Sequence, residues 1–559
     1  MRRALEPVRA LRDALANPNL RRAELALGSY LTGEWAYQVA LAVFAYDLGG
    51  ASAVGLLWFV QMIPAALAAP FSSLLADRFP RERVLLAINI AKATVVAAVA
   101  ALAQADAPAG PVFALAAIAA VTSAAFRPTN WALIPLLCRT PRELVAANVS
   151  SSTIEGLAVF AGPAAAGALL TVGSSPGVIA ASAGAFLLAA GLAARVRTDE
   201  RLQRQSAARP LDELLAGVQT LRAEPHPRLM IQLFSSQTLV RGMLNVLVVV
   251  IALELLELGG SGVGFLNAAY GVGGLLGGLA ALSLVGRLRL GLPFALALVL
   301  WGTPIAIIGF WPEAIVAFLA LALTGAGNSV LDVSGFTLVQ RLVDDRVLAR
   351  VFGVLETMVF LTVGIGGLLA PLLVAGLGAR GALIVTGAFL PALALLAWRR
   401  LGVLDRATAV PVRELELLRR VRLFHPLPAP QIERIARRLE PVKARPGDTL
   451  VRQGEPGDRF YVVSSGNVEV SANGAALRTL SAGDCFGEIA LIENRPRTAT
   501  VTARTDAELF ALEREDFIDA VTVSVRSAQS AAKLIEERLE ASERRAEEAK
   551  PPAELGLDR

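Results

Sequence analysis

Four ionisable residues lie near the middle of long apolar stretches. They are two acids, Glu34 and Glu155, and two arginines, Arg127 and Arg241. A charge at the depth of a bilayer is costly, and such residues usually pair with one another or mark a substrate or ion pathway. We therefore expect a central polar cavity in which these groups pair, bind substrate or carry protons. Lys92 is expected at a shallower position, at the rim.

Asp332 is a further candidate for this cavity. If the two halves of the membrane part are repeats, Glu34 corresponds to Arg241, and Arg127 corresponds to Asp332. Opposite charges at equivalent positions predict ion pairs that exchange as the halves rock. A static ion pair that holds helices together remains the alternative. Proton coupling through Glu34 or Glu155 is a hypothesis that replacement of each acid by Gln would test.

About twelve apolar segments carry these charges, each near the 20 residues that a helix needs to cross a bilayer. The chain has 559 residues, of which 55% are hydrophobic and 18% charged, and the charge deficit falls within residues 24–398. We predict an α-helical membrane protein with two six-helix halves, 23–195 and 229–400, joined by a polar linker at 196–228. The segments centre near 24–46, 53–76, 84–104, 112–137, 144–171, 177–195, 230–255, 263–285, 292–310, 314–340, 351–375 and 381–398.

The loops between these segments alternate in charge. DRFPRER (77–83) and GRLRL (286–290) are basic, whereas DLGGAS (47–52) has no Lys or Arg. Basic loops stay on the cytoplasmic side, so we expect both termini in the cytoplasm and the helices in the cell's inner membrane. Residues 1–22 lack the apolar core and cleavage site of a signal peptide and read as a cytoplasmic segment.

The loop at 73–83 carries a resemblance to a known family. It reads SLLADRFPRER, which resembles the loop motif G-x-L-A-D-R-x-G-R-R of the major facilitator superfamily of transporters. Ser73 and Pro80 stand where that family usually has glycine. The resemblance implies a cytoplasmic gating loop formed by Asp77, Arg78 and Arg81.

Other features of the membrane part bear on transport. FRPTNWALIPLL (126–137) is similar to the siderophore- and drug-exporter branch of the same superfamily. The glycine-rich runs at 271–280 and 364–369 are expected to let helices pack closely rather than to bind phosphate. The sequence has no G-x-x-x-x-G-K-[S/T] motif, so nothing supports ATP-driven transport.

Beyond residue 400 the pattern changes to that of a charged, water-exposed domain. A linker at 401–412 precedes two amphipathic helices, and short alternating runs split by turns then predict an antiparallel β-roll over 441–513. FYVVSSGNVEVSA (460–472) is predicted to form a hairpin. Helices are expected again at 514–523 and 526–549, before a tail at 550–559.

Residues 486–499 of this roll read FGEIALIENRPRTA. They closely resemble the phosphate-binding cassette of cyclic-nucleotide-binding domains, and the resemblance extends over the domain at 413–549. The nucleotide-binding residues that it implies are Phe486, Gly487, Glu488, Ile489, Ala490, Arg497, Thr498 and Ala499. The cyclic nucleotide, cAMP or cGMP, would be a regulatory ligand, and no cofactor is expected.

The chemistry of these residues fits that ligand. A short helix after Gly487 offers backbone N–H groups to an anion, and Arg497 can fork onto a phosphate. Glu488 can accept a hydrogen bond from the ribose, and Thr498 is compatible with either base. A roll in which Arg497 merely pairs with a carboxylate is the alternative. The helix at 526–549 would be a lid, an exposed helix or a dimer contact.

These features predict a secondary transporter, an exporter of a small molecule, regulated by cytoplasmic cyclic nucleotide. The alternatives are a nucleotide-sensing membrane receptor without transport, and a lipid or lysophospholipid flippase of the same fold. A homodimer through the C-terminal domain stays open. No nucleophile–base set or metal site is apparent, and the chain has only two Cys and two His, so we expect neither an enzyme nor a metalloprotein. The basic loops explain the net charge of +5, so nucleic acid is not expected as a partner.

Overall fold

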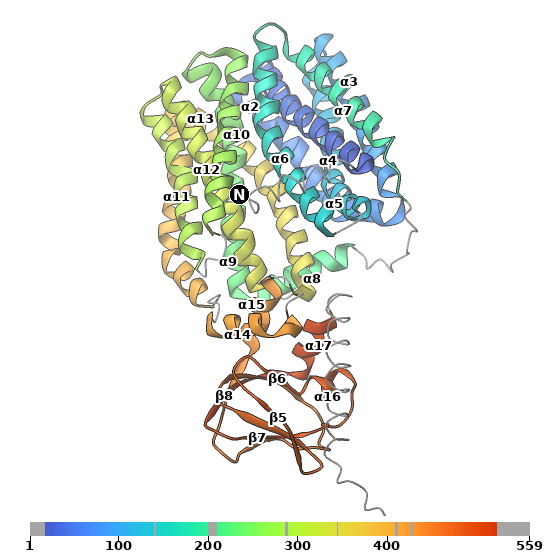
Figure 1. Cartoon of the computed structure of the whole chain (residues 1–559). Coiled ribbons are helices and arrows are strands. Elements are labelled where there is room, and N and C mark those ends of the chain that lie inside the picture. The colour runs from blue at the N-terminus through green and yellow to red at the C-terminus, as the bar shows by residue number, and fades with distance from the viewer. Residues whose placement is uncertain are drawn as a thin grey trace, which may run out of the picture. The chain divides into compact units, whose positions relative to one another are not determined.

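The computed structural model has two compact units, Met1–Thr408 and Ala409–Arg559, and each is described by itself. The structure describes residues 17–138, 141–198, 210–284, 289–343, 345–407, 412–424, 427 and 429–522. The first unit is built of long helices, and the second combines two sheets with short helices (Figure 1).

The first unit is helical over nearly all of its described residues. Its elements are α2 (Pro18–Arg78), α3 (Arg81–Gln104), α4 (Ala109–Ala124), α5 (Phe126–Leu137), α6 (Pro141–Leu170), α7 (Ser175–Ala193), α8 (Pro210–Ala223), α9 (Pro225–Val250), η1 (Ile251–Leu255), α10 (Gly259–Ala281), η2 (Leu282–Leu284), α11 (Gly291–Phe310), α12 (Ala314–Leu342) and α13 (Asp345–Ala407).

Ten helical stretches of the described residues are long and apolar enough to cross a membrane. The two longest contain breaks. The backbone of α2 leaves the helical region at Gly49 and Gly50, and that of α13 does so at Gly378. These breaks lie where the sequence predicts loops between the first two and the last two segments. The predicted helical membrane fold is confirmed, whereas the number of twelve segments stays a prediction.

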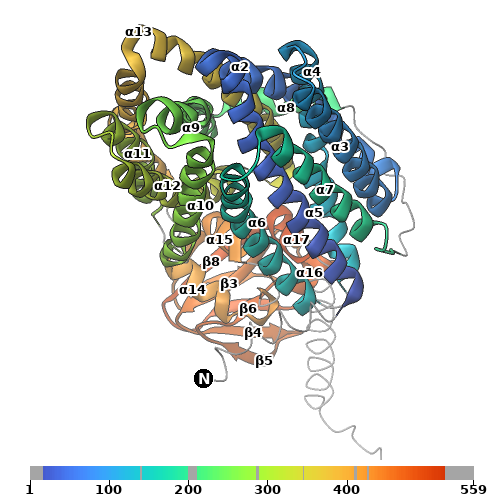
Figure 2. The ribbon, with the colours of Figure 1, turned by 90° about the horizontal axis from the view of Figure 1, so that it is seen from above.

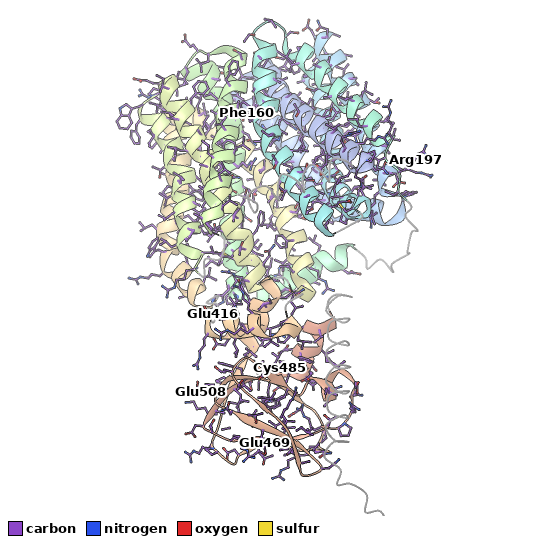
Figure 3. All side chains as sticks on the ribbon, in the orientation of Figure 1. Phe160, Arg197, Glu416, Glu469, Cys485 and Glu508 are labelled. Atoms are coloured by element: carbon purple, nitrogen blue, oxygen red, sulfur yellow. The ribbon has the colours of Figure 1, made fainter. Side chains whose placement is uncertain are left out.

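The helices α2 to α7 and α9 to α13 form two groups, seen along the bundle in Figure 2. The groups meet where α6 packs against α10 and where α2 packs against α13. Phe160 is labelled on α6 in Figure 3. Helix α2 also contacts α9 across the same boundary.

Glycines of the run 271–280 bring α10 into backbone contact with its neighbours. A Cβ atom added at Gly273 would lie 1.7 Å from the carbonyl oxygen of Ala322 on α12. One added at Gly271 would lie 2.6 Å from the carbonyl oxygen of Val159 on α6. Helix interiors are close-packed, so a side chain at either position would push the helices apart. The close packing expected for this run is confirmed.

The second unit is a roll of two four-stranded antiparallel sheets, with strand orders β1-β8-β3-β6 and β2-β7-β4-β5. The strands are β1 (Glu440–Ala444), β2 (Thr449–Val451), β3 (Arg459–Ser465), β4 (Val468–Ala472), β5 (Ala475–Leu480), β6 (Cys485–Phe486), β7 (Thr500–Ala503) and β8 (Ala507–Glu513). The helical elements are α14 (Val412–Arg420), η3 (Arg422–Phe424), α15 (Ala429–Arg438), α16 (Glu488–Ile492) and α17 (Arg514–Thr522).

The hairpin predicted for 460–472 is wrong. Strand β3 pairs with β6 and β8, whereas β4 pairs with β5 and β7, so the two strands belong to different sheets. The chain passes between the sheets at Gly466, whose φ is 83° and where a Cβ atom would lie 2.3 Å from the carbonyl oxygen of Asp506. Figure 3 labels Glu469 on β4 and Glu508 on β8, one in each sheet. Two alternating runs around a glycine turn suggest a hairpin locally, but long-range partners decide the pairing.

Aromatic side chains fix the short helices on the β1-β8-β3-β6 sheet. The ring of Phe460 on β3 stacks on Phe517 of α17 at 4.6 Å between centroids and meets Phe424 of η3 edge-on at 5.7 Å. On α15, Ile432 and Ile435 are buried, as the three-residue spacing of its apolar face predicts. This packing holds the flanking helices against the roll that carries the cassette.

Candidate nucleotide site and intramembrane charges

The predicted cassette begins with a tight turn and the short helix α16. Gly487 follows β6 with a φ of 94°, a left-handed conformation that favours glycine. A Cβ atom at this position would lie 2.6 Å from Nη1 of Arg497 and 2.9 Å from the carbonyl oxygen of Arg459. Both the conformation and the space at this turn therefore require glycine.

Arg497 is buried behind this turn, with 5% of its surface exposed. Its Nη1 donates to the carbonyl oxygen of Gly487 at 3.1 Å, and its Nη2 donates to the carbonyl oxygen of Arg459 at 2.7 Å and to Oδ1 of Asp458 at 3.1 Å. A guanidinium has five N–H groups, so these bonds leave two for a ligand. The carboxylate pairing that the sequence left open is therefore present, but it occupies a single N–H group.

Charged and aromatic side chains surround Arg497. Tyr461 stacks on Phe486 at 5.0 Å between ring centroids. Burial raises the pKa of the Tyr461 hydroxyl above its ordinary value, and Asp458 raises it further. Burial alone would lower the pKa of Arg459. Its ion pairs with Glu513 of β8 and Glu440 of β1 instead raise that pKa. The tyrosine thus stays neutral and the arginine stays charged near neutral pH.

A pocket lies against the cassette. All the cassette residues predicted as ligands line it: Phe486, Gly487, Glu488, Ile489, Ala490, Arg497, Thr498 and Ala499. The carboxylate-bearing Glu488 is 1% exposed. The structure therefore gathers the whole predicted set around one cavity.

Four further residues line the pocket from the β2-β7-β4-β5 sheet: Val451, Val470, Arg478 and Val501. Sequence analysis missed Arg478, which lies on β5 opposite Val470 of β4. The short strand β5 does not itself reveal which of its faces points inward. Its pairing with β4 places this arginine opposite Val470, another residue of the pocket lining.

In the membrane unit, Glu34 on α2 forms an ion pair with Lys92 on α3, with 2.8 Å between Oε2 and Nζ. Lys92 is fully buried, and its expected shallower position at the rim stays a prediction. Its Nζ also donates to the carbonyl oxygen of Ala119 at 2.9 Å and to Oγ of Ser123 at 2.5 Å. This ammonium therefore has two hydrogen-bond acceptors besides its ion pair with Glu34. The other carboxylate oxygen of Glu34 accepts a bond from Gln38 at 3.1 Å.

The remaining predicted charges lie on α5, α6, α9 and α12. Nη2 of Arg127 is 3.9 Å from Oε2 of Glu155. Asp332 accepts a hydrogen bond from Asn328 at 2.7 Å and interacts electrostatically with Arg241 and, more weakly, with Arg127. The guanidinium of Arg241 also lies 5.9 Å from the centre of the Tyr270 ring.

These contacts differ from the pairs inferred from the repeat. The described ion pair of Glu34 is with Lys92 rather than Arg241, and that of Arg127 is with Glu155 rather than Asp332. Both described pairs join helices within the same half. The repeat argument compared equivalent positions but could not rank them against nearer partners on adjacent helices.

Some predicted elements lie outside the described residues. The side chains of Asp77 and Arg78 are among them, although the backbone of both ends α2. Arg81 opens α3 and is partly buried. The predicted lid helix at 526–549 and the segments 1–16 and 550–559 are likewise not described. Within the described ranges, no group of three or more His, Cys, Asp or Glu residues is placed to hold a metal ion.

Two family models match the sequence. The model described as Major Facilitator Superfamily matches residues 25–288 and 233–439, which together exceed half of the chain. The model described as Cyclic nucleotide-binding domain matches residues 441–523. Neither of these is a family of enzymes.

The relatives found by sequence match the C-terminal part. The cAMP-dependent protein kinase type II regulatory subunit of Drosophila melanogaster is 37% identical over 142 residues, covering 24% of this chain and 37% of that protein. The cGMP-dependent protein kinase egl-4 of Caenorhabditis elegans is 41% identical over 87 residues, covering 16% and 11%. This chain thus spans well under half the length of either relative.

Among solved structures, the regulatory domain of Toxoplasma gondii PKA with cAMP is 30% identical. The match covers 24% of this chain and 52% of that one, with a TM-score of 0.21.

Proposed function

Since this chain belongs to the Major Facilitator Superfamily and ends in a cyclic nucleotide-binding domain, we propose that it is a secondary active transporter regulated by cyclic nucleotide. The observation that carries the regulatory half is the convergence of all the predicted cassette residues on one pocket. The observation that supports transport is the set of charged side chains inside the helical unit. Charged side chains are costly within membrane helices, and those that occur there usually serve a function.

The nucleotide would bind with its phosphate at the cassette. The backbone turn at Gly487 and the two N–H groups left on Arg497 suit an anion, and their positive charge stabilises it. Glu488, buried in the pocket wall, would accept a bond from the ribose hydroxyl. The base would then lie against the valines of the β2-β7-β4-β5 sheet, since these give the pocket an apolar surface outside the cassette.

Arg478 favours cGMP over cAMP in this arrangement. An arginine can donate two hydrogen bonds to O6 and N7 of guanine, whereas adenine presents an amino donor in place of O6. Arg478 lines the same pocket as Thr498, whose hydroxyl can also contact the ligand. The presence of this guanidinium in the pocket lining thus supports a guanine nucleotide as the preferred ligand.

The protein would lie in the cell's inner membrane with both termini in the cytoplasm. The alternation of basic and uncharged loops supports this orientation. It would place the nucleotide domain where cyclic nucleotides are made. We further propose export of a small molecule as the direction and cargo of transport, on the similarity of 126–137 to exporters.

Calorimetry on the full-length protein in lipid nanodiscs tests the ligand. cGMP and cAMP are titrated into wild type, Arg497→Ala and the matched control Arg504→Ala. Arg504 pairs with Glu469 and is largely exposed, and it is not among the pocket residues. We expect Arg497→Ala to lose binding and Arg504→Ala to retain it. Equal affinities in all three proteins would refute the site.

Regulation is tested separately, in proteoliposomes with and without nucleotide inside. Fluorescent ethidium and a fluorescent lysophospholipid serve as two probes, because a small-molecule exporter and a lipid flippase differ in which one they move. A nucleotide-dependent change in movement of either probe, absent in Arg497→Ala, is the expected result. Binding of nucleotide without any effect on movement would contradict regulation while leaving the binding site intact.

A further inference from the structure

The guanidinium group of Arg241 on α9 makes no hydrogen bond within the part of the chain that the structure describes. Its contacts are the ring of Tyr270 on α10, whose centre is 5.9 Å away, and an electrostatic interaction with Asp332 on α12. The carboxylate of Asp332 instead accepts a hydrogen bond from Asn328 at 2.7 Å. A guanidinium has five N–H groups, so those of Arg241 are available to a ligand.

Arg127 on α5 is a second arginine of this kind, in the other half of the helical unit. Its Nη2 lies 3.9 Å from Oε2 of Glu155, which is beyond hydrogen-bond distance. The side chain of Arg127 is 50% exposed. Charged side chains within membrane helices face protein or a water-filled cavity rather than lipid. The exposure of Arg127 therefore indicates a water-filled space beside α5.

Arg127 and Arg241 approach a common point from the two halves. Both interact electrostatically with Asp332, although Arg127 belongs to the first half and the other two residues belong to the second. Arg241 and Asp332 are also partly exposed. Glu155 and Asp332 balance the two positive charges, but neither accepts a described hydrogen bond from the arginines. The pair thus keeps its donors free for an anion.

An aromatic ring accompanies each guanidinium group. Tyr270 lies beside Arg241. Trp131 follows Arg127 by four positions on α5, a spacing that places both side chains on the same face of the helix. The side chain of Trp131 is 56% exposed. Aromatic side chains pack well against the ring of a ligand, so this surroundings suits an anion that carries an aromatic ring.

We propose that Arg127 and Arg241 bind the cargo and that the cargo is a small aromatic anion. The proposal rests on the transport function proposed above and names the chemical class of its substrate. The anionic group would accept charge-assisted hydrogen bonds from both guanidinium groups. Its ring would lie against Trp131 or Tyr270. A ligand shifts a conformational equilibrium only through contacts that differ between the states, and an anion bound by one arginine of each half makes such contacts.

Lys92 does not share this role, although it is a cation inside the same unit. Its ammonium lies 2.8 Å from the carboxylate of Glu34 and also donates to Ala119 and Ser123. It is fully buried. A cargo would therefore have to displace the partners of Lys92, whereas it finds the two arginines without hydrogen-bond acceptors.

Calorimetry with three probes that share one ring system tests the class of cargo. The probes are 2-naphthoate, 2-naphthalenemethanol and 2-naphthylmethylammonium, which are an anion, a neutral alcohol and a cation. Each is titrated into the full-length protein in phosphatidylcholine nanodiscs, and empty nanodiscs give the background of partition into lipid. We expect 2-naphthoate to bind about tenfold more tightly than the other two, or better, because it alone forms charge-assisted bonds with guanidinium groups. Equal affinities for the three probes, or no binding of 2-naphthoate, would overturn the proposal.

Substitution of the arginines tests the position of the site. Arg127→Gln and Arg241→Gln should each weaken 2-naphthoate binding about tenfold or more, because each removes charge-assisted bonds. Arg241→Lys keeps the charge but loses the fork of donors, so it should weaken binding by a smaller factor. The matched control Arg399→Gln lies at an exposed position of α13 and should bind as wild type does. Thermal unfolding verifies the fold of each variant. Unchanged affinity in either Gln variant, or an equal loss in the control, would overturn the proposal.

These titrations use neither nucleotide nor movement of cargo. Their failure leaves regulated transport of another class of cargo standing, and absence of transport leaves their results unchanged. Because ethidium is a cation, 2-naphthoate serves as a third probe in the transport assay described above.

Discussion

Removal of Glu34 should destabilise the membrane unit more than removal of its partner Lys92. Lys92 is 0% exposed, whereas the side chain of Glu34 is 19% exposed. Glu34→Gln leaves the ammonium buried without a counter-charge, and breaking a buried pair in this way costs about 3–5 kcal/mol. Lys92→Met leaves a carboxylate that retains Gln38 and partial solvation, so we expect a smaller cost of about 1–3 kcal/mol.

The double variant Glu34→Gln/Lys92→Met should recover most of this loss. It leaves no uncompensated charge, and replacing both partners of a buried pair is often close to neutral. The two single costs would then add to roughly 4–8 kcal/mol, whereas the double variant should cost no more than about 2 kcal/mol, a large coupling energy for contacting residues.

Denaturant unfolding of the full-length protein in detergent micelles, followed by tryptophan fluorescence, measures this cycle. The exposed pair Arg413–Glu508, 2.7 Å apart with side chains 63% and 43% exposed, serves as the control cycle. Its coupling should stay below about 1 kcal/mol, because surface ion pairs contribute little. Equal costs for the two single variants would refute the asymmetry argued from burial. Additive costs in the double variant would refute the coupling between Glu34 and Lys92.

Three further predictions concern the nucleotide domain. Arg497→Ala should weaken nucleotide binding by about 10²- to 10⁴-fold in calorimetry, because two charge-assisted bonds are lost at about 1.5–3 kcal/mol each; a change below threefold would contradict a phosphate contact. Arg478→Ala should weaken cGMP roughly tenfold or more and leave cAMP nearly unchanged, because only guanine offers two acceptors to an arginine; equal losses for both nucleotides would contradict base recognition. Gly487→Ala should lower both the melting temperature and the nucleotide affinity, because it adds a collision with Arg497 to about 1–2 kcal/mol of left-handed strain. The control Gly447→Ala has a φ of 93° and open space, so it should incur the strain alone and bind nucleotide normally.

The cassette could be predicted because its residues are contiguous. The run from Phe486 to Ala499 carries its turn, its helix and its arginine within a single stretch of sequence. The resemblance of this stretch to a known phosphate-binding cassette therefore predicted the pocket residues that it contains. Sequence analysis did not predict Arg478 as a pocket residue, because its place in the pocket depends on the pairing of β5 with β4. No short-range pattern reveals that pairing.

The ion pair that the sequence did not predict in the membrane part and the wrong hairpin in the roll have the same physical origin. The type of each segment follows from its hydropathy, and the helical fold was predicted correctly. The partner of Glu34 and the pairing of β3 instead depend on which of several distant segments comes closest. Packing between α2, α3 and α4 encloses Lys92, and sequence spacing alone does not reveal this packing.

The hydrogen bonds from Arg497 to two backbone carbonyl oxygens affect how fast the domain can bind a nucleotide. Gly487 and Arg459 fix the guanidinium with bonds that the protein makes by itself. A phosphate that binds there does not have to immobilise a flexible side chain, which would otherwise cost about 0.5–1.5 kcal/mol. Capture can then be rapid, and the lifetime of the complex is governed by dissociation. Arg478, which also lines the pocket, would slow dissociation of the nucleotide and so lengthen the time for which the domain stays occupied after the nucleotide concentration falls.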